Sequence, residues 1–437
     1  MEGIIMKKVL AVLLSLAFVL SLAACGSKGA ADPTDETKEA ETMALEAKDT
    51  IKVGAILVGD ETEGYTLAHM NGMEAAVEAL KAEGKTVELL YKKKVPEDTQ
   101  VETEANNLIA SGCDVIITNS YGHQFNFGSV IEQNPDVVFV SMTGDQAAGS
   151  GLPNYFNAFT KVFESRYVSG VVAGLKLKEL LDSGKLNPTD RPEAYDGDNI
   201  KIGYVGAFAY AEVVSGYTAF YLGLKSVVDN VVMTVKYTNS WFSEEREAAV
   251  GEFLMNQGCV IIGQHADSTG APAAVEKAHK AGTNTMCYSV GYNVPMNDVA
   301  PDVVLTSASN NWEAYYETLF RAVLDGKPVP QDWAEGYAAD AVCITELGDA
   351  CAEGTQAKVD ETIAAIKDGS LKVFDCSTFT VKGEHLTSYT KSYGMEGPET
   401  IKTEGGKTFF DESTIRSAPY FDVRIDGITE IASDYAE

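Results

Sequence analysis

Short apolar runs alternate with segments of helical spacing along most of this chain, and this alternation restricts the fold more than any other feature of the sequence. The first series of strand-like runs comprises 52–58, 86–91, 114–118 and 137–140. The segments of helical spacing between these runs are 67–83, 99–111 and 127–133. Apolar strands that are separated by helices are typical of a parallel sheet covered on both faces.

A second series of the same kind begins at 201, after a polar, proline-bearing stretch at 182–199 that we interpret as a loop. Its strand-like runs are 201–205, 231–237, 259–262 and 285–288. Its helical segments are 212–228, 244–257 and 271–281, and a further one covers 312–325. Two consecutive series of similar length predict an α/β protein with two lobes and a ligand cleft between them. The terminal part is rich in β-formers and turns.

The N-terminus has the layout of a secretion signal. Lys7 and Lys8 precede the apolar run 9–20, which is too short for an ordinary membrane span. The run ends in Leu22-Ala23-Ala24-Cys25, which resembles the lipobox of bacterial lipoproteins. We therefore expect a signal peptide at 1–24, a lipid on Cys25 that anchors the chain to a membrane, and a flexible tether at 25–48. The alternative is an ordinary signal peptide that happens to end near a cysteine.

The composition argues against a nucleic-acid-binding protein and against a zinc-binding protein. The 437 residues include 34 Lys and Arg against 64 Asp and Glu, a net charge of −30, whereas a nucleic-acid binder needs a basic surface. The seven cysteines show no CxxC spacing, so we expect no zinc site. A Cys343–Cys351 disulfide is left open by the sequence.

Aromatic and polar residues follow nearly every predicted strand, where open parallel sheets bind their ligands. These segments are 59–69, 119–123, 206–210, 239–242, 264–268 and 290–293. Rings next to amides, hydroxyls and carboxylates suit a flat, neutral ligand that forms hydrogen bonds at its edge. Packing inside a lobe is an equal interpretation for Phe208 and Tyr210, and capping of the next helix is an equal interpretation for Asp267.

Several segments along the chain, some of them at these strand ends, resemble the basic membrane protein family of lipoproteins. Members of this family are substrate-binding components of ABC transporters for purine nucleosides or bases. The segments that carry the resemblance are Gly64-Tyr65-Thr66-Leu67-Ala68-His69, 118–122, 164–170, 212–214, 220–223, 239–242, 264–268, 305–307, 311–312 and 315–316. The resemblance covers about 51–383 and implies a two-lobed type I periplasmic-binding-protein-like fold. We expect 49–160 plus about 290–332 to form the first lobe, and 161–289 plus about 333–390 to form the second. The extension 391–437 lies outside the resemblance.

The resemblance also implies a site. A purine ring would lie between Tyr65 and Trp241, with polar contacts near its edge. The candidate ligand-binding residues are Tyr65, Asn119, Ser120, Tyr121, Phe208, Trp241, Gln264, Asp267, Asn293 and Trp312. Nucleoside-binding members carry an Asp in place of Asn293 and a Lys near 309–311, and the absence of both charges favours a free base, or another flat heterocycle, over a nucleoside.

An enzyme is the main competing interpretation. His265, Asp267 and Ser268 are triad residue types, but four consecutive positions cannot easily align them, and no nucleophile-elbow or Walker motif is present. We therefore expect a monomeric binding protein that is not an enzyme, holds no cofactor or metal, and works with ABC permease subunits at the extracytoplasmic face of the cell membrane. A ligand-sensing receptor and an extracellular nucleoside hydrolase are the alternatives.

Overall fold

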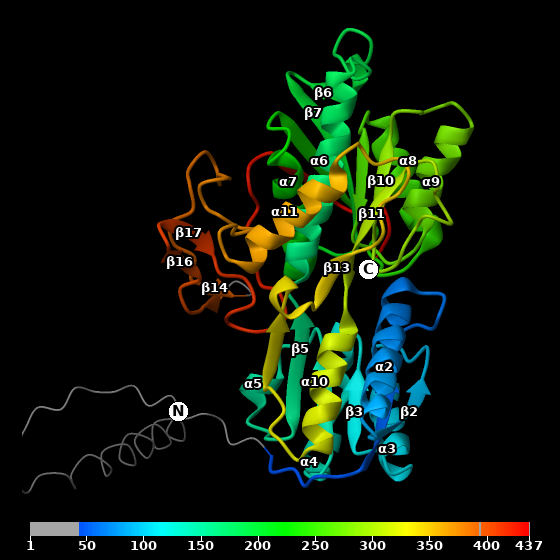
Figure 1. Ribbon diagram of the computed structural model, residues 1–437, viewed down its shortest axis with the longest axis vertical. Helices are drawn as coiled ribbons and strands as arrows, with labels where there is room; N and C mark the ends of the chain where they lie inside the picture. Colours follow the sequence, from blue (N-terminus) through cyan, green and yellow to red (C-terminus); the bar gives the residue numbers. More distant parts are fainter. Residues whose placement is uncertain (1–42, 393–394, 437) are drawn as a thin grey trace, which may run out of the picture. The chain divides into compact units, whose positions relative to one another are not determined.

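The computed structural model describes residues 43–392 and 395–436, and its main elements are two large sheets with helices packed against them (Figure 1). The six-stranded sheet has the order β12-β5-β4-β3-β1-β2, and every neighbouring pair in it is parallel. Its strands are β1 (Thr50–Ile56), β2 (Thr86–Lys92), β3 (Val115–Thr118), β4 (Val138–Met142), β5 (Tyr155–Thr160) and β12 (Asp332–Glu335).

The second sheet has the order β13-β11-β10-β9-β7-β8-β18, and β6 adds to β7. Its strands are β6 (Tyr195–Asp196), β7 (Asn199–Gly206), β8 (Val231–Tyr237), β9 (Ile261–Gln264), β10 (Tyr288–Tyr292), β11 (Val304–Asn310), β13 (Val342–Ile344) and β18 (Ile428–Ile431). Only β6 and β13 pair antiparallel with their neighbours. The predicted α/β fold with mostly parallel sheets is confirmed.

Helices connect the strands of both sheets. The α-helices are α2 (Gly64–Ala82), α3 (Gln100–Ala110), α4 (Val130–Gln133), α5 (Ala147–Ser150), α6 (Val162–Asp182), α7 (Ala211–Lys225), α8 (Glu244–Asn256), α9 (Gly270–Lys280), α10 (Trp312–Leu324) and α11 (Thr355–Lys367). The 3₁₀-helices are η1 (Tyr121–Asn126), η2 (Pro192–Ala194) and η3 (Tyr337–Ala339). The hairpins β14 (Lys391–Ser392) with β15 (Met395–Glu396) and β16 (Ile401–Glu404) with β17 (Lys407–Phe410) follow.

Each large sheet carries an apolar core on both faces, which explains why its strands are apolar throughout. In β1, Val53 packs in the core beneath α2 and α10, whereas Ile56 packs in the core beneath α3 and α4. In β9, Ile261 joins the core beneath α6 and α7, and Ile262 joins the core beneath α8 and α9. Successive side chains of a strand point to opposite faces, so adjacent residues fill different cores.

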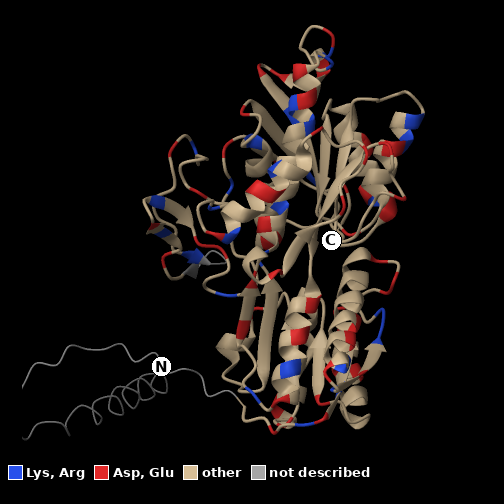
Figure 2. Cartoon of the chain, viewed as in Figure 1, with Lys and Arg blue, Asp and Glu red and all other residues tan. Residues whose placement is uncertain are grey.

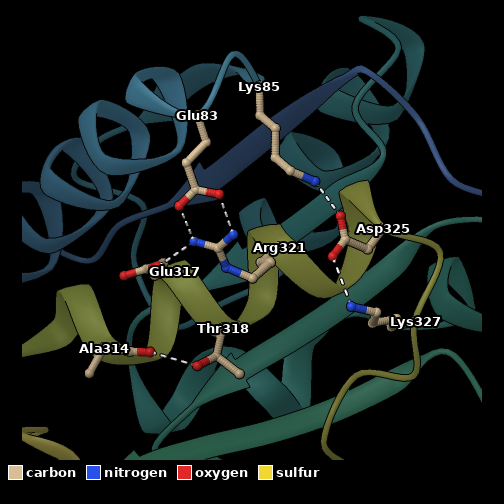
Figure 3. Close-up of polar contacts among 8 residues, drawn as sticks. All are labelled: Glu83, Lys85, Ala314, Glu317, Thr318, Arg321, Asp325 and Lys327. Carbon is tan, nitrogen blue, oxygen red and sulfur yellow. Dashed lines mark hydrogen bonds and ion pairs between the residues drawn. The ribbon is translucent and has the colours of Figure 1, made fainter.

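Helices α2 and α10 pack against each other and are joined at their ends by ion pairs (Figure 3). The Arg321 guanidinium donates to both carboxylate oxygens of Glu83, at 2.6 and 2.8 Å, and to Glu317 at 2.5 Å. Asp325 accepts from Lys85 and from Lys327. Exposed pairs of this kind contribute little to stability, so apolar packing determines the position of α10. This position matters because α10 begins at Trp312, next to the site described below.

The chain crosses between the two sheets three times. The crossings lie between β5 and α6, between β11 and α10, and between β12 and β13. They are bonded to one another, since the Thr160 hydroxyl donates to Asn310 and the Asn311 amide donates to the Ala341 carbonyl at 2.9 Å. The sequence analysis assigns about 290–332 to the first lobe, but β11 pairs in the second sheet and only α10 and β12 join the first. Parallel pairing of β11 with β10 accounts for the difference.

Two terminal segments differ from the sequence-based expectations. Cys25 and most of the expected tether lie outside the described residues, but the Met43 amide donates to Pro153 at 3.0 Å and the Lys48 amide donates to Leu324 at 2.8 Å. Residues 43–48 therefore lie along the first lobe. At the other end, the extension supplies β18, which pairs in parallel with β8 and becomes an edge of the second sheet.

Charged residues are spread along the chain, and acidic residues are interspersed with Lys and Arg (Figure 2). The described helices include none that has the length and apolar character needed to cross a membrane.

Cys343 and Cys351 are both free thiols in the structure.

Candidate functional site

A cavity of about 440 Å³ opens where the carboxyl ends of strands from both sheets meet. This volume lies within the range of about 300–1,000 Å³ that is typical of small-molecule sites. Its lining consists of Val58, Glu63, Tyr65, Asn119, Ser120, Tyr121, Thr143 and Phe159 from the first sheet's side, Ala209, Tyr210, Ala211, Glu212, Trp241, His265, Asp267 and Tyr292 from the second, and Ala418, Pro419, Asp422 and Arg424 from the C-terminal extension.

Tyr65 supplies the aromatic wall on the first sheet's side. It lies in the first turn of α2, which Glu63 caps by accepting the Thr66 amide at 3.3 Å. Its ring meets His69 edge to face, with centroids 4.4 Å apart, and His69 stacks on Trp312 at 4.1 Å. The buried Tyr65 hydroxyl has no hydrogen-bond partner among the described residues. The ring is thus held by its neighbours, while its buried hydroxyl is unsatisfied.

Tyr210 and Trp241 form the aromatic wall on the second sheet's side, and Phe208 packs behind them. Phe208 and Tyr210 stack with centroids 5.2 Å apart, and Trp241 contacts Phe208 at 5.0 Å and Tyr210 at 6.0 Å. Tyr210 also approaches Tyr121 of the other wall at 6.4 Å. Aromatic faces therefore line the cavity from both sides, an arrangement suited to a flat ring.

Asp267 is one of the carboxyl groups that line the cavity. The Asn293 amide donates to it at 2.6 Å, and the Gln264 amide donates at 2.8 Å to the carbonyls of Ala266 and Ser268 on either side. Thr269 occupies the N-cap position of α9, so Asp267 is not the cap of that helix. Its loop is therefore fixed by two amides while the carboxyl faces the cavity.

A close approach brings α2 against this loop. A Cβ atom at Gly64 would lie 3.2 Å from the Asp267 carbonyl oxygen, tighter than most real contacts, so glycine lets the first turn of α2 approach the second lobe.

On the same cavity, Thr143 has a φ of 60°, which a β-branched residue rarely adopts. Backbone strain of this kind clusters at ligand sites.

Two of the cavity's carboxyl groups favour the neutral form. Burial raises the pKa of Glu63, although the hydroxyl and amide of Thr66 oppose the shift. Burial also raises the pKa of Asp267 well above its ordinary value, and repulsion from Glu63, Glu247 and Glu212 adds to the effect. Burial thus disfavours charge on both carboxyl groups, so this part of the cavity suits an uncharged ligand that forms hydrogen bonds.

His265 is paired with an acid and does not form a catalytic triad. Its Nε2 lies 2.7 Å from both carboxylate oxygens of Glu212, and burial lowers its pKa. Ser268, the nucleophile that such a triad would need, has its hydroxyl oxygen engaged by the Gly270 amide at 3.1 Å. The described residues contain no cluster of three or more His, Cys, Asp and Glu that is placed to hold a metal ion.

The structure brings six of the ten predicted ligand-binding residues to the cavity wall: Tyr65, Asn119, Ser120, Tyr121, Trp241 and Asp267. The other four lie behind it. Phe208 packs on Trp241, Trp312 is buried behind Tyr65, and Gln264 and Asn293 hold the Asp267 loop. Asn119 is itself tied into the wall, because its carbonyl accepts the Val58 amide at 2.8 Å and its amide donates to Thr66 at 3.1 Å.

The sequence analysis missed other residues on the wall: Glu63, Thr143, Glu212, His265 and Tyr292, together with the four from the extension. Glu63, Glu212, His265 and Tyr292 belong to strand exits or to the helix that follows one, so the strand-exit rule could have found them. The residues of the extension carry no such signal, because their position depends on β18 pairing with β8.

Residues 67–373 match the family model Bmp, described as ABC transporter substrate-binding protein PnrA-like. The chain belongs to the Bmp family. It is 31% identical over 359 residues to a purine-binding protein of Brucella abortus, covering 82% of this chain and 92% of that one. It is also 27% identical over 286 residues to a putative ABC transporter glucose-binding protein of Haloferax volcanii, covering 65% of each.

Solved structures agree with this Bmp-family assignment at the level of the fold. An ABC transporter solute-binding protein from Aeropyrum pernix gives a TM-score of 0.58 at 15% identity, covering 74% of this chain and 93% of that one. A transcriptional activator of the comK gene from Bacillus halodurans gives 0.54 at 16% identity, covering 73% and 99%. The two-lobed, periplasmic-binding-protein-like fold is confirmed. As a Bmp-family member, the chain is an extracytoplasmic transport component with a small-molecule ligand and permease partners, and it is not an enzyme.

Proposed function

We propose that this protein captures a purine base or a related nucleoside in the cavity between its lobes and delivers it to the permease of an ABC importer. The observation that carries the proposal is the placement of Tyr65 and Trp241, one from each lobe, on the lining of one cavity that Asp267 also lines. Each aromatic contact with a flat ring adds about 0.5–1.5 kcal/mol beyond burial.

The electrostatics support a neutral heterocycle. Burial raises the pKa values of Glu63 and Asp267, which disfavours charge on these carboxyl groups and supports an uncharged ligand. The edge of a purine carries ring nitrogens that accept and amino or ring N–H groups that donate. The purine-binding relative in Brucella abortus, which is matched over 82% of this chain, supports the same ligand class.

A thermal-shift screen tests the ligand class. The panel contains adenine, hypoxanthine, guanine, their ribonucleosides, glucose and amino acids, each added to the purified two-lobed protein at equal concentration. We expect stabilisation by at least one purine and none by amino acids. Stabilisation by glucose alone would refute the purine assignment while leaving the transport role intact.

We further propose that a lipid on Cys25 anchors the protein at the outer face of the membrane. The support is the lipobox-like sequence Leu22-Ala23-Ala24-Cys25 after an apolar run. Expression of the full chain and of Cys25→Ser in a bacterium that processes lipoproteins, followed by membrane fractionation and mass spectrometry, tests this. The wild type should be membrane-bound with an acylated N-terminal cysteine, and an unmodified, freely soluble wild type would contradict the proposal.

A further inference from the structure

The C-terminal extension is part of the cavity although it lies outside the match to the family model, which ends at 373. Four of its residues, Ala418, Pro419, Asp422 and Arg424, line the same cavity as Tyr65 and Trp241. Any ligand held between the aromatic walls therefore faces a third wall that lies outside the match to the family model.

This third wall is fixed to the second lobe by alternating burial. Phe421, Val423 and Ile425 are buried in the apolar core of the second lobe, and the Phe421 ring stacks on Phe374 with centroids 4.3 Å apart. The residues between them, Asp422 and Arg424, are left on the opposite side, where they meet the cavity. Alternation of this kind is the pattern of extended chain packed on one face.

The segment also contacts the first lobe. The Ser417 amide donates to the Asp332 carboxylate at 2.9 Å, and Asp332 begins β12 of the six-stranded sheet. Arg416 lies 3.9 Å from the carboxylate of Asp145, which follows β4 of the same sheet. The wall is therefore positioned by both lobes.

Asp422 and Arg424 are held in place by neighbouring groups. The Tyr389 hydroxyl donates to Oδ1 of Asp422, while Arg424 donates from Nε to Glu430 at 3.1 Å and from Nη1 to the Asp422 carbonyl at 2.7 Å. Glu430 in turn accepts the Tyr217 hydroxyl at 2.8 Å. Among the described residues, Oδ2 of Asp422 and Nη2 of Arg424 have no hydrogen-bond partner.

We propose that Asp422 and Arg424 bind a hydroxyl-bearing substituent, such as a sugar, on the ring held by the aromatic walls, and so determine whether the cavity prefers a substituted or a free ring. A hydroxyl group donates a hydrogen bond to a carboxylate and accepts one from a guanidinium, so the two residues together can satisfy both its donor and its acceptor. This inference rests on the proposed purine ligand. It also opposes the expectation of a free base, which considered only positions near Asn293 and 309–311.

Calorimetric titration of each free purine and its ribonucleoside into wild type, Asp422→Asn and Arg424→Gln tests the proposal. We expect the wild type to bind the nucleoside more tightly. Each substitution should weaken the nucleoside about tenfold or more, as expected for a hydrogen bond to a charged group, and change the affinity for the base less than threefold. Glu404→Gln, an exposed carboxylate on β16 away from the cavity lining, should change neither affinity.

Hydrogen exchange of 416–425 provides a second readout that does not depend on the variants folding well. The nucleoside should protect this segment more than the base does. A nucleoside-to-base ratio that is unchanged in both variants, or a wild type that binds the base and rejects the nucleoside, overturns the role of Asp422 and Arg424. A wild type that binds no purine at all overturns the proposed function, and this inference with it, and that failure is visible before any variant is made.

Discussion

Replacing Trp241 by alanine removes one aromatic wall of the proposed site. Trp241 is half-buried and contacts Phe208 and Tyr210, so its free face is available to a ligand. Stacking of a base on an aromatic ring contributes about 1–3 kcal/mol. Loss of that contact should raise the dissociation constant of the purine about 5- to 160-fold.

The stability of the unliganded protein separates this prediction from a folding defect. Trp241→Ala should lower the free energy of unfolding by about 1–2 kcal/mol, because the ring is only partly packed. Trp312→Ala is the matched comparison, since Trp312 is 1% exposed and its loss should cost about 3–5 kcal/mol. Trp241→Ala should therefore mainly weaken ligand binding, whereas Trp312→Ala should mainly lower the free energy of unfolding.

Calorimetry with the purine that gives the largest thermal shift, together with thermal melts of the unliganded proteins, measures both quantities. Trp241→Phe retains an aromatic face and should keep most of the affinity. Unchanged affinity in Trp241→Ala would refute the stacking argument. A loss of stability as large as that of Trp312→Ala would show that Trp241 is a core residue.

Three further predictions concern stability. Burial raises the pKa of Glu247 to about 7 from an ordinary 4.5, so the folded state holds an extra proton between these two pH values. The free energy of unfolding should therefore fall as the pH rises from 4.5 to 7. Glu247→Gln should remove about 3 kcal/mol of that fall, measured by denaturant titrations at pH 4.5 and 7.5. A Cβ at Gly223 would lie 2.0 Å from a backbone oxygen of the facing helix, so Gly223→Ala should lower the free energy of unfolding by about 1–3 kcal/mol. A Cβ at Gly149 would meet nothing within 4 Å, so Gly149→Ala should be nearly neutral in the same denaturation assay. Phe421→Ala should cost about 3–5 kcal/mol and Phe125→Ala, 59% exposed, less than about 0.5 kcal/mol, and equal melting temperatures for these two variants would contradict the placement of the extension in the core.

Two strands that the sequence analysis missed, β5 and β11, carry polar residues on their buried faces. In β5, Asn157 interrupts the apolar pattern, yet it is buried because it accepts the Ala147 amide at 2.8 Å and donates to the Ser141 carbonyl at 3.2 Å. In β11, Thr306 is buried and donates to the Thr345 carbonyl at 2.9 Å. These partners come from other parts of the chain, so a local pattern does not reveal them.

Helix α6 was missed for a related reason. It is buried on nearly every side, including Arg166 and Ser169, so it lacks the polar face that gives an amphipathic helix its period. Arg166 is tolerated there because it donates to the Tyr204 hydroxyl at 3.0 Å and lies 3.5 Å over the Tyr292 ring. Helix α11 lies in the terminal part that the sequence analysis described only as rich in β-formers and turns.

The site was partly predictable because parallel strands bring their carboxyl ends to one edge. That rule located Tyr65, Trp241 and Asp267. It does not distinguish a ring on the wall from one that supports the wall, and Phe208 shows the difference, since it packs behind Trp241. The third wall required long-range pairing of the extension, which single-sequence patterns do not specify.

The central claim is that one purine ligand binds in the cavity between the two lobes. Isothermal titration of the purified protein with adenine, hypoxanthine, guanine and their ribonucleosides, with glucose as the competing solute, measures this directly. We predict saturable binding of a purine at one site per chain, lost or strongly weakened in Trp241→Ala. Saturable binding of glucose with no heat from any purine would contradict the account.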